Sequence, residues 1–227
     1  MGTYNGPRIV QNGLILVIDA SNPRSYIGSG TAINDLKQKA NGTINGTVTF
    51  SSAGTSSYFN FATASSSNYI SSTVSQPYVD CTIVFYPDFT LNSNAGLAGL
   101  IAASNDATNT DKSMRFAGAT NPGPWTVISA STINTDDWGY ASTTYYLNGS
   151  AVAHGASLVN GWNILGAYRT NQSTFPASFA YFLGTEGFSS AVRDFQGRIA
   201  AVYLYDRQLS ANEHRQNYEA LRYRFRL

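Results

Sequence analysis

The sequence predicts an all-β domain in which two antiparallel sheets pack face to face, with one helix near the C-terminal end. Three observations indicate this fold class. Short apolar or alternating runs recur along the chain, stretches rich in Gly, Asn and Ser separate them, and only one clear helix start is present. A chain of 227 residues is long enough for one large sandwich. We find no internal repeat and no linker, so we expect a single domain over residues 1–227.

The first half of the chain begins with a strand and continues with short strands between polar loops. Residues 13–19 (GLILVID) are apolar on both faces, which is typical of a strand covered on both sides. The loop at 22–30 ends this strand. The Asn-Gly pairs at 41–42 and 45–46 favour tight turns because both residue types accept positive φ. Further strands are expected at 47–50, 58–61 and 68–71.

The second half carries the stronger hairpin signal. An Asn-Gly pair at 148–149 separates two short runs that have strand composition, which predicts a two-residue hairpin turn. The single cysteine, Cys81, cannot form an internal disulfide and is expected to be a small buried hydrophobic residue. Strands are expected at 82–86, 99–103, 113–118, 125–132, 140–147, 163–167, 179–182 and 199–205.

The one predicted helix follows a capping box. Ser210 takes the N-cap position and Glu213 follows three residues later, so that each side chain satisfies a free backbone amide of the other residue. The helix is expected over about residues 211–222 and should face the sandwich with one stripe of side chains. The stripe consists of His214, Tyr218, Leu221 and Phe225.

Composition excludes several classes of partner. The net charge is +1 and only 12% of residues are charged, so nucleic acid and anionic membrane surfaces are not expected partners. No apolar run approaches the roughly 18–20 residues of a membrane span, and the first residues do not resemble a signal peptide. Low charge together with 13% aromatic residues suits an extracellular β-protein or a member of a larger assembly.

Three segments together resemble a known family. They are residues 12–26 (NGLILVIDASNPRSY), residues 146–149 (YLNG) and residues 195–210 (FQGRIAAVYLYDRQLS). In this order they are similar to the opening, the central hairpin and the last strand of laminin-G-like domains in virion proteins of tailed bacteriophages. Those domains belong to the concanavalin A-like lectin and glucanase superfold. The resemblance therefore implies a jelly-roll sandwich.

The resemblance also implies a function. We expect a non-enzymatic structural protein of the phage virion, exposed as a capsid decoration or as a fibre or tail accessory and made in the cytoplasm of the bacterial host. Its partners would be other virion proteins of the capsid or tail. The alternative is a lectin-like adhesin that binds a glycan of the host cell surface. The Asp-rich turn of many family members is absent around residues 60–69, so no calcium site is expected.

Catalytic and metal-binding chemistry finds little support in the residues. Glycoside hydrolysis commonly needs two carboxylates that face each other, and the Glu-x-Asp-x-x-Glu pattern of the superfold's glucanases is absent. The adjacent Asp136 and Asp137 would point to opposite faces of an extended segment. Two histidines, His154 and His214, and one cysteine cannot make up a zinc site. We therefore expect no enzyme activity, no metal and no cofactor.

Glycan binding, if present, needs an aromatic side chain exposed to the sugar. Trp138 follows two aspartates and precedes Gly139, so it is expected in an exposed turn and is the best candidate for stacking on a sugar ring. Trp125 and Trp162 lie beside predicted strands and are expected to pack in the core.

The chain ends in an alternation of cationic and apolar residues that a free helix end does not require. We expect this tail to take part in assembly, either in a symmetric homo-oligomer or as a repeated copy on the particle. The alternative is that the cations complement the helix dipole while Phe225 packs on the sandwich. The candidate assembly residues are Arg222, Tyr223, Arg224, Phe225 and Arg226.

Overall fold

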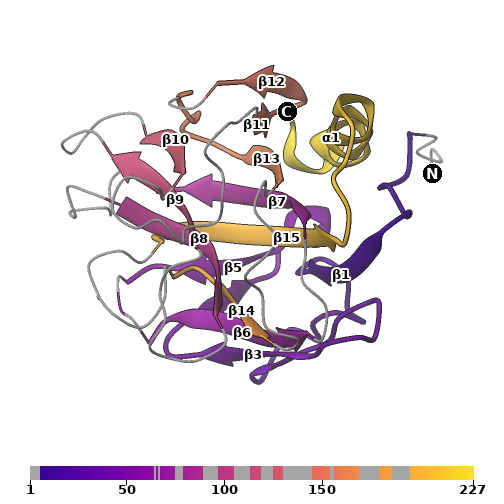
Figure 1. Ribbon diagram of the computed structural model, residues 1–227. Coiled ribbons are helices and arrows are strands. Elements are labelled where there is room, and N and C mark those ends of the chain that lie inside the picture. Colours follow the sequence, from indigo (N-terminus) through magenta and orange to yellow (C-terminus); the bar gives the residue numbers. More distant parts are fainter. Residues whose placement is uncertain are drawn as a thin grey trace.

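The fold is described by a computed structural model, which confirms the predicted class: two antiparallel sheets and one C-terminal helix (Figure 1). No helix of the described residues combines the length and the apolar character that a membrane crossing requires. The structure describes residues 6–63, 65, 67–74, 79–88, 97–104, 113–118, 125–129, 145–153, 156–168, 179–185 and 195–227.

The larger sheet is centred on the strand nearest the helix in sequence, β15 (Gly197–Tyr205). One edge of β15 pairs with β7 along its whole length, and the other edge pairs with β5 and then with β1. The strand order is β12 (Ser150–Val152), β11 (Tyr145–Leu147), β13 (Asn163–Tyr168), β7 (Asp80–Pro87), β15, β5 (Tyr58–Phe61) and β4 (Thr49–Ser51), with β1 (Leu14–Asp19) beside β15.

The smaller sheet faces the larger one. Its order is β10 (Trp125–Ser129), β9 (Ser113–Gly118), β8 (Leu97–Ser104), β14 (Phe179–Leu183), β6 (Tyr69–Val74), β3 (Gly42–Asn45) and β2 (Ala32–Ile33). All the strand pairs described in both sheets are antiparallel.

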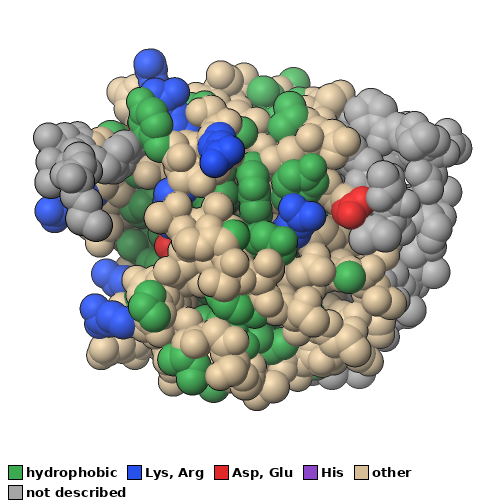
Figure 2. Space-filling view, turned by 180° about the vertical axis from the view of Figure 1, so that it is seen from behind, with side chains coloured by type: hydrophobic (Ala, Val, Ile, Leu, Met, Phe, Trp, Pro, Cys, Tyr) green, Lys and Arg blue, Asp and Glu red, His purple; other side chains and the backbone are tan. Residues whose placement is uncertain are grey.

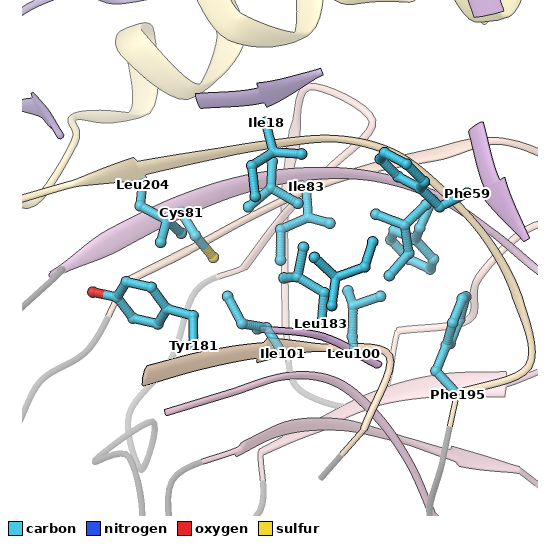
Figure 3. Close-up of a cluster of buried hydrophobic side chains, with 14 of the residues drawn as sticks. Ile18, Phe59, Cys81, Ile83, Leu100, Ile101, Tyr181, Leu183, Phe195 and Leu204 are labelled. Atoms are coloured by element: carbon cyan, nitrogen blue, oxygen red, sulfur yellow. The ribbon is translucent and has the colours of Figure 1, made fainter. Parts of the chain in front are cut away.

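Two apolar layers hold the domain together. The first lies between the sheets and contains, among others, Ile83, Leu100 and Leu183, each at most 3% exposed (Figure 3). The second lies between the outer face of the larger sheet and the helix α1 (Ala211–Phe225). Because β1 contributes side chains to both layers, all six of its residues are buried, as the apolar run at 13–19 predicts.

The hairpin predicted at Asn148-Gly149 is present. Both residues have positive φ, 50° and 80°, as a two-residue turn between β11 and β12 requires. A side chain at Gly149 would lie 2.5 Å from the Tyr218 ring, so the helix packs directly on this turn. The Asn-Gly pair at 41–42 behaves differently from the prediction, because Gly42 is the first residue of β3 and pairs with Ile33 and Ser72.

The capping box of α1 is present as predicted, and the helix runs three residues beyond the expected end at 222. It ends because Arg226 adopts the left-handed conformation and its backbone N–H donates to the carbonyl of Arg222. His214, Leu221 and Phe225 of the predicted stripe are buried, and Asn217 is buried with them.

Candidate functional site

The loop that follows β1 is held in one conformation by short-range hydrogen bonds. Ser25 is fully buried; its hydroxyl accepts from the backbone N–H of Asp19 (3.1 Å) and donates to the carbonyl of Asn34 (2.9 Å). The N–H of Asn34 donates in turn to the carbonyl of Ser25 (2.8 Å). The hydroxyl of Tyr26 donates to the carbonyl of Gly30 (2.7 Å). A ligand on this loop therefore meets a preformed surface, which lowers the entropy cost of binding.

A second loop lies beside the first and is fixed to it by the C-terminal helix. This loop contains a short 3-10 helix, η1 (Gly54–Ser56). The carbonyl of Thr55 accepts from the hydroxyl of Ser21 (2.7 Å) and from Nε of Arg224 (2.8 Å). The other two guanidinium nitrogens of Arg224 bind both carboxylate oxygens of Asp19, at 2.7 and 2.8 Å. One side chain of the helix thus links the end of β1 to the second loop.

Two adjoining hollows, of about 510 and 520 Å³, lie over these loops. Pro23 and Ile27 line both hollows and so separate them, and the Ile27 side chain is 75% exposed. The first, called the Arg24 hollow, is also lined by Arg24, Asn34, Asp35, Leu36, Gln38 and Asn41. The second, called the Phe50 hollow, is also lined by Ser21, Tyr26, Gly28, Phe50, Ser52 and Ser57, among others. The two together are called the loop groove.

The Phe50 hollow combines aromatic surface with hydroxyl groups. The Phe50 ring is half-buried and meets the ring of Tyr26 edge to face, with centroids 5.0 Å apart. Tyr26 packs in turn on Phe59 at 5.2 Å, and burial raises the pKa of the Tyr26 hydroxyl. Gly28 has a φ of +94°, and a side chain there would contact Phe50 at 3.6 Å. Glycine therefore allows the turn and leaves the edge of Phe50 open to the hollow.

The Arg24 hollow is lined mainly by amide side chains. Asn34, Gln38 and Asn41 are all exposed there and can both donate and accept hydrogen bonds. The carboxylate of Asp35 is different, since it is only 2% exposed and accepts from four backbone N–H groups, those of residues 17, 37, 39 and 40. Asp35 therefore shapes the loop and offers no free acceptor to a ligand.

The predicted stacking residue, Trp138, lies outside the described residues, as do Asp136, Asp137 and His154. Trp162 is half-buried, and its ring packs against Tyr58 (5.8 Å), Tyr86 (5.7 Å) and Phe225 (4.8 Å), which agrees with the packing role predicted for it. Trp125 belongs to β10. The aromatic residues that line the groove, Tyr26 and Phe50, were not predicted from the sequence. Their only signal is that one lies in the loop at 22–30 and the other ends a short strand beside a Ser-rich loop.

The predicted assembly tail makes contacts within its own chain. Arg224 binds Asp19 as described, and Phe225 is 4% exposed against Trp162. Arg222 binds Glu219 at 2.7 Å, while Tyr223 is 59% exposed and Arg226 caps the helix. Two of the five residues are thus already engaged in packing the helix on the sandwich. A role of the tail in assembly stays a prediction.

The histidine of the helix and a carboxylate of the sheet form a buried pair beneath α1. His214 Nε2 lies 3.2 Å from Asp80 Oδ2, and neither side chain is more than 1% exposed. The His214 ring stacks on Tyr146 with centroids 4.0 Å apart. A substrate cannot reach this pair, so it belongs to the scaffold. Across the described ranges, no group of three or more His, Cys, Asp or Glu residues is placed to hold a metal ion.

The comparisons with known proteins bear on the fold. No family model matches the sequence, and no curated protein matches it either. Among solved structures, Trypanosoma rangeli sialidase with the inhibitor DANA matches 93% of this chain and 33% of its own, with a TM-score of 0.52 and 13% identity. The structure of the same sialidase with 2,3-difluorosialic acid, a covalent intermediate, matches with a TM-score of 0.53 and 14% identity.

A second protein, described as a mutant of HCR/D, matches 91% of this chain and 51% of its own, with a TM-score of 0.50 and 11% identity. At these identities the likeness establishes the fold. It agrees with the predicted concanavalin A-like, jelly-roll sandwich. The chain spans about a third of the length of the sialidase chains it matches. The comparisons lend no support to a phage origin, so the virion role and virion location stay predictions.

One prediction is wrong on this comparison: that the chain is not an enzyme. It depended on the absence of a carboxylate pair, yet the structures that share this fold include those of a sialidase, one of them solved as a covalent intermediate. The absence of the glucanase carboxylate pattern therefore does not exclude enzyme activity for this chain.

Proposed function

We propose that this chain is a carbohydrate-binding domain and that its glycan binds in the loop groove. The observation that carries the proposal is the pair of adjoining hollows of about 510 and 520 Å³ on either side of Ile27. Volumes of this size are typical of sites for small ligands. The chain is poor in charge, and on the face seen in Figure 2 uncharged and apolar side chains predominate.

The chemistry of the groove fits a sugar chain. A sugar ring presents hydroxyl groups at its rim and an apolar C–H face, so its site needs neutral hydrogen-bonding groups beside apolar surface. The amides of Asn34, Gln38 and Asn41 supply the first, and Ile27 with the edge of Phe50 supplies the second. The hydrogen bonds that fix both loops mean that little order has to be imposed on binding.

The comparisons support this proposal through the fold. The sialidase that shares the sandwich over nearly all of this chain has been solved with sialic acid and with the inhibitor DANA. Carbohydrate binding is thus a function found in proteins that contain this fold. Within the proposal, the glycan belongs to a cell surface to which the protein attaches, as in the adhesin alternative.

The test is binding of the purified protein to an array of glycans, followed by calorimetry with the strongest ligand. Ile27→Asp should abolish binding, because it places a charge between the hollows, and should leave the midpoint of thermal unfolding unchanged because the side chain is 75% exposed. Val159→Asp is the matched control, since Val159 is also an exposed apolar side chain (48%) and lines neither hollow.

If Ile27→Asp binds the glycan with full affinity, the glycan does not bind in the loop groove. Failure of the wild-type protein to bind any glycan of the array would overturn the proposed function itself.

A further inference from the structure

The Arg24 hollow is lined by one cationic side chain, that of Arg24. Arg24 is exposed, and among the described residues no ion pair or hydrogen bond of its guanidinium is found. Its backbone, in contrast, is fixed: the N–H donates to the Asn22 side chain (3.0 Å) and the carbonyl accepts from Asn34 Nδ2 (3.3 Å). The structure therefore holds the base of this side chain and leaves its charged end at the hollow.

The neighbouring sequence adds cations and almost no accessible anion. Residues 20–57 contain Arg24, Lys37 and Lys39, and their only acidic residue is Asp35. Asp35 is buried, and its oxygens already accept from four backbone N–H groups. The preceding acid, Asp19, is bound by Arg224. Within residues 20–57 the cations therefore outnumber the anions by three to one, and this excess favours a negatively charged ligand group.

The Arg24 hollow is also lined by neutral side chains that can form hydrogen bonds. Gln38 has a left-handed backbone, with a φ of 59°, and its N–H donates to the carbonyl of Asp35 at 2.9 Å. This turn places Gln38 on the lining together with Asn34 and Asn41. A guanidinium binds a planar or tetrahedral anionic group through paired N–H donors, while amides suit the hydroxyl groups beside it.

We propose that the Arg24 hollow binds the acidic sugar of an acidic glycan, with its carboxylate or sulfate group on Arg24, while the Phe50 hollow takes a neutral neighbour. This inference rests on the proposed function and names its substrate class. The shared chemistry is an anionic oxygen group on a sugar ring. The Phe50 hollow contributes no charged side chain to the lining described above, so the discrimination between acidic and neutral glycans lies at Arg24.

The test compares sialylated, glucuronate-bearing and sulfated oligosaccharides with the same oligosaccharides lacking the acidic group. The wild-type protein should bind the acidic member of at least one pair about tenfold more tightly at low salt, and about 0.5 M NaCl should remove most of that preference because it screens the charge. Arg24→Gln should remove the preference, so that the acidic and neutral members of a pair bind with equal affinity. Arg24→Lys should retain only part of it.

Arg215→Gln is the matched control, because it makes the same change of net charge at an exposed position of α1 that lines neither hollow. Equal binding of acidic and neutral members by the wild-type protein would overturn this inference and leave the proposed function standing. A preference that survives Arg24→Gln would also overturn it. Absence of binding to both members of every pair would contradict the proposed function as well.

Discussion

The layer beneath helix α1 and the loop groove are both rich in polar groups, but they use them in opposite ways. Under the helix, Asp80, His214 and Asn217 are at most 3% exposed, and their side chains link the helix to the sheet. Beneath the groove, buried polar groups such as Ser25 bind the backbone, while the groove itself is lined by exposed side chains such as Asn34. The difference teaches that the buried titratable groups beneath α1 serve the scaffold, while neutral groups and one arginine line the proposed glycan site.

Burial accounts for the arrangement under the helix. Burial raises the pKa of Asp80, and this effect exceeds the opposing influence of His214 and of the backbone N–H of Leu209, which donates to Asp80 at 2.9 Å. Asn217 adds hydrogen bonds to Thr82 (3.0 Å) and to the hydroxyl of Tyr205 (3.0 Å). These groups fix the position of α1 on the sheet, and with it the position of Arg224 beside the groove.

The largest effect is expected from breaking the buried pair. His214→Ala removes the imidazole that faces the buried Asp80 carboxylate, which should lower the free energy of unfolding by about 3–5 kcal/mol. Urea unfolding at neutral pH measures it. Arg215→Ala, on the exposed side of the same helix, is the control and should change stability by no more than about 0.5 kcal/mol. A loss below about 1 kcal/mol for His214→Ala would contradict the scaffold role.

An intermediate effect is expected at Arg224, which connects the two regions. Arg224→Gln removes the paired hydrogen bonds to Asp19 and the one to the Thr55 carbonyl, so stability should fall by about 2 kcal/mol. Because Thr55 lies on the second loop of the groove, glycan affinity should fall as well, although Arg224 does not line either hollow.

The control for Arg224 is Arg226→Gln, which removes an equal charge from the same tail. Its side chain is exposed, and both stability and affinity should stay near the wild-type values. Calorimetry on the folded protein separates the two readouts. Unchanged affinity in Arg224→Gln, together with the expected loss of stability, would confine this residue to the scaffold.

The smallest effect concerns pH and the start of α1. The Arg207 guanidinium, together with the backbone and side chain of Ser210, lowers the pKa of Glu213 to about 2. A carboxyl group with a lowered pKa in the folded state stabilises the protein above its pKa in the unfolded state, about 4.3, and this contribution is lost as the pH falls toward the folded-state value. Since Glu213 and Arg207 are 27% and 30% exposed, solvent screening reduces the effect to about 1 kcal/mol.

The measurement is the change in unfolding free energy between about pH 7 and pH 2.5 for the wild-type protein and for Glu213→Gln, which retains a capping-box side chain. The variant should lose about 1 kcal/mol less than the wild type over this range. Identical pH profiles for the wild type and Glu213→Gln would refute the assignment.

The sequence predicts the scaffold better than the site for a physical reason. Strands and helix starts are encoded by neighbouring residues, as in the apolar run of β1 and the capping box at Ser210. The groove is not encoded locally, because Tyr26 and Phe50 come together only when the loop after β1 packs against β4. Asn217 shows an intermediate case: helical spacing from His214 places it on the buried face, yet the predicted stripe did not include it.

The central position of β15 has a consequence for how the chain reaches this structure. β1 is synthesised well before its pairing partner β15, whose residues 201–205 lie more than 180 positions later. Until β15 emerges from the ribosome, the run Leu14–Asp19 lacks the strand with which it pairs, and both of its apolar faces are exposed. Pairings of such long sequence separation form slowly. We therefore expect this segment to be prone to aggregation until β15 has been synthesised, and the whole sandwich to fold late in synthesis.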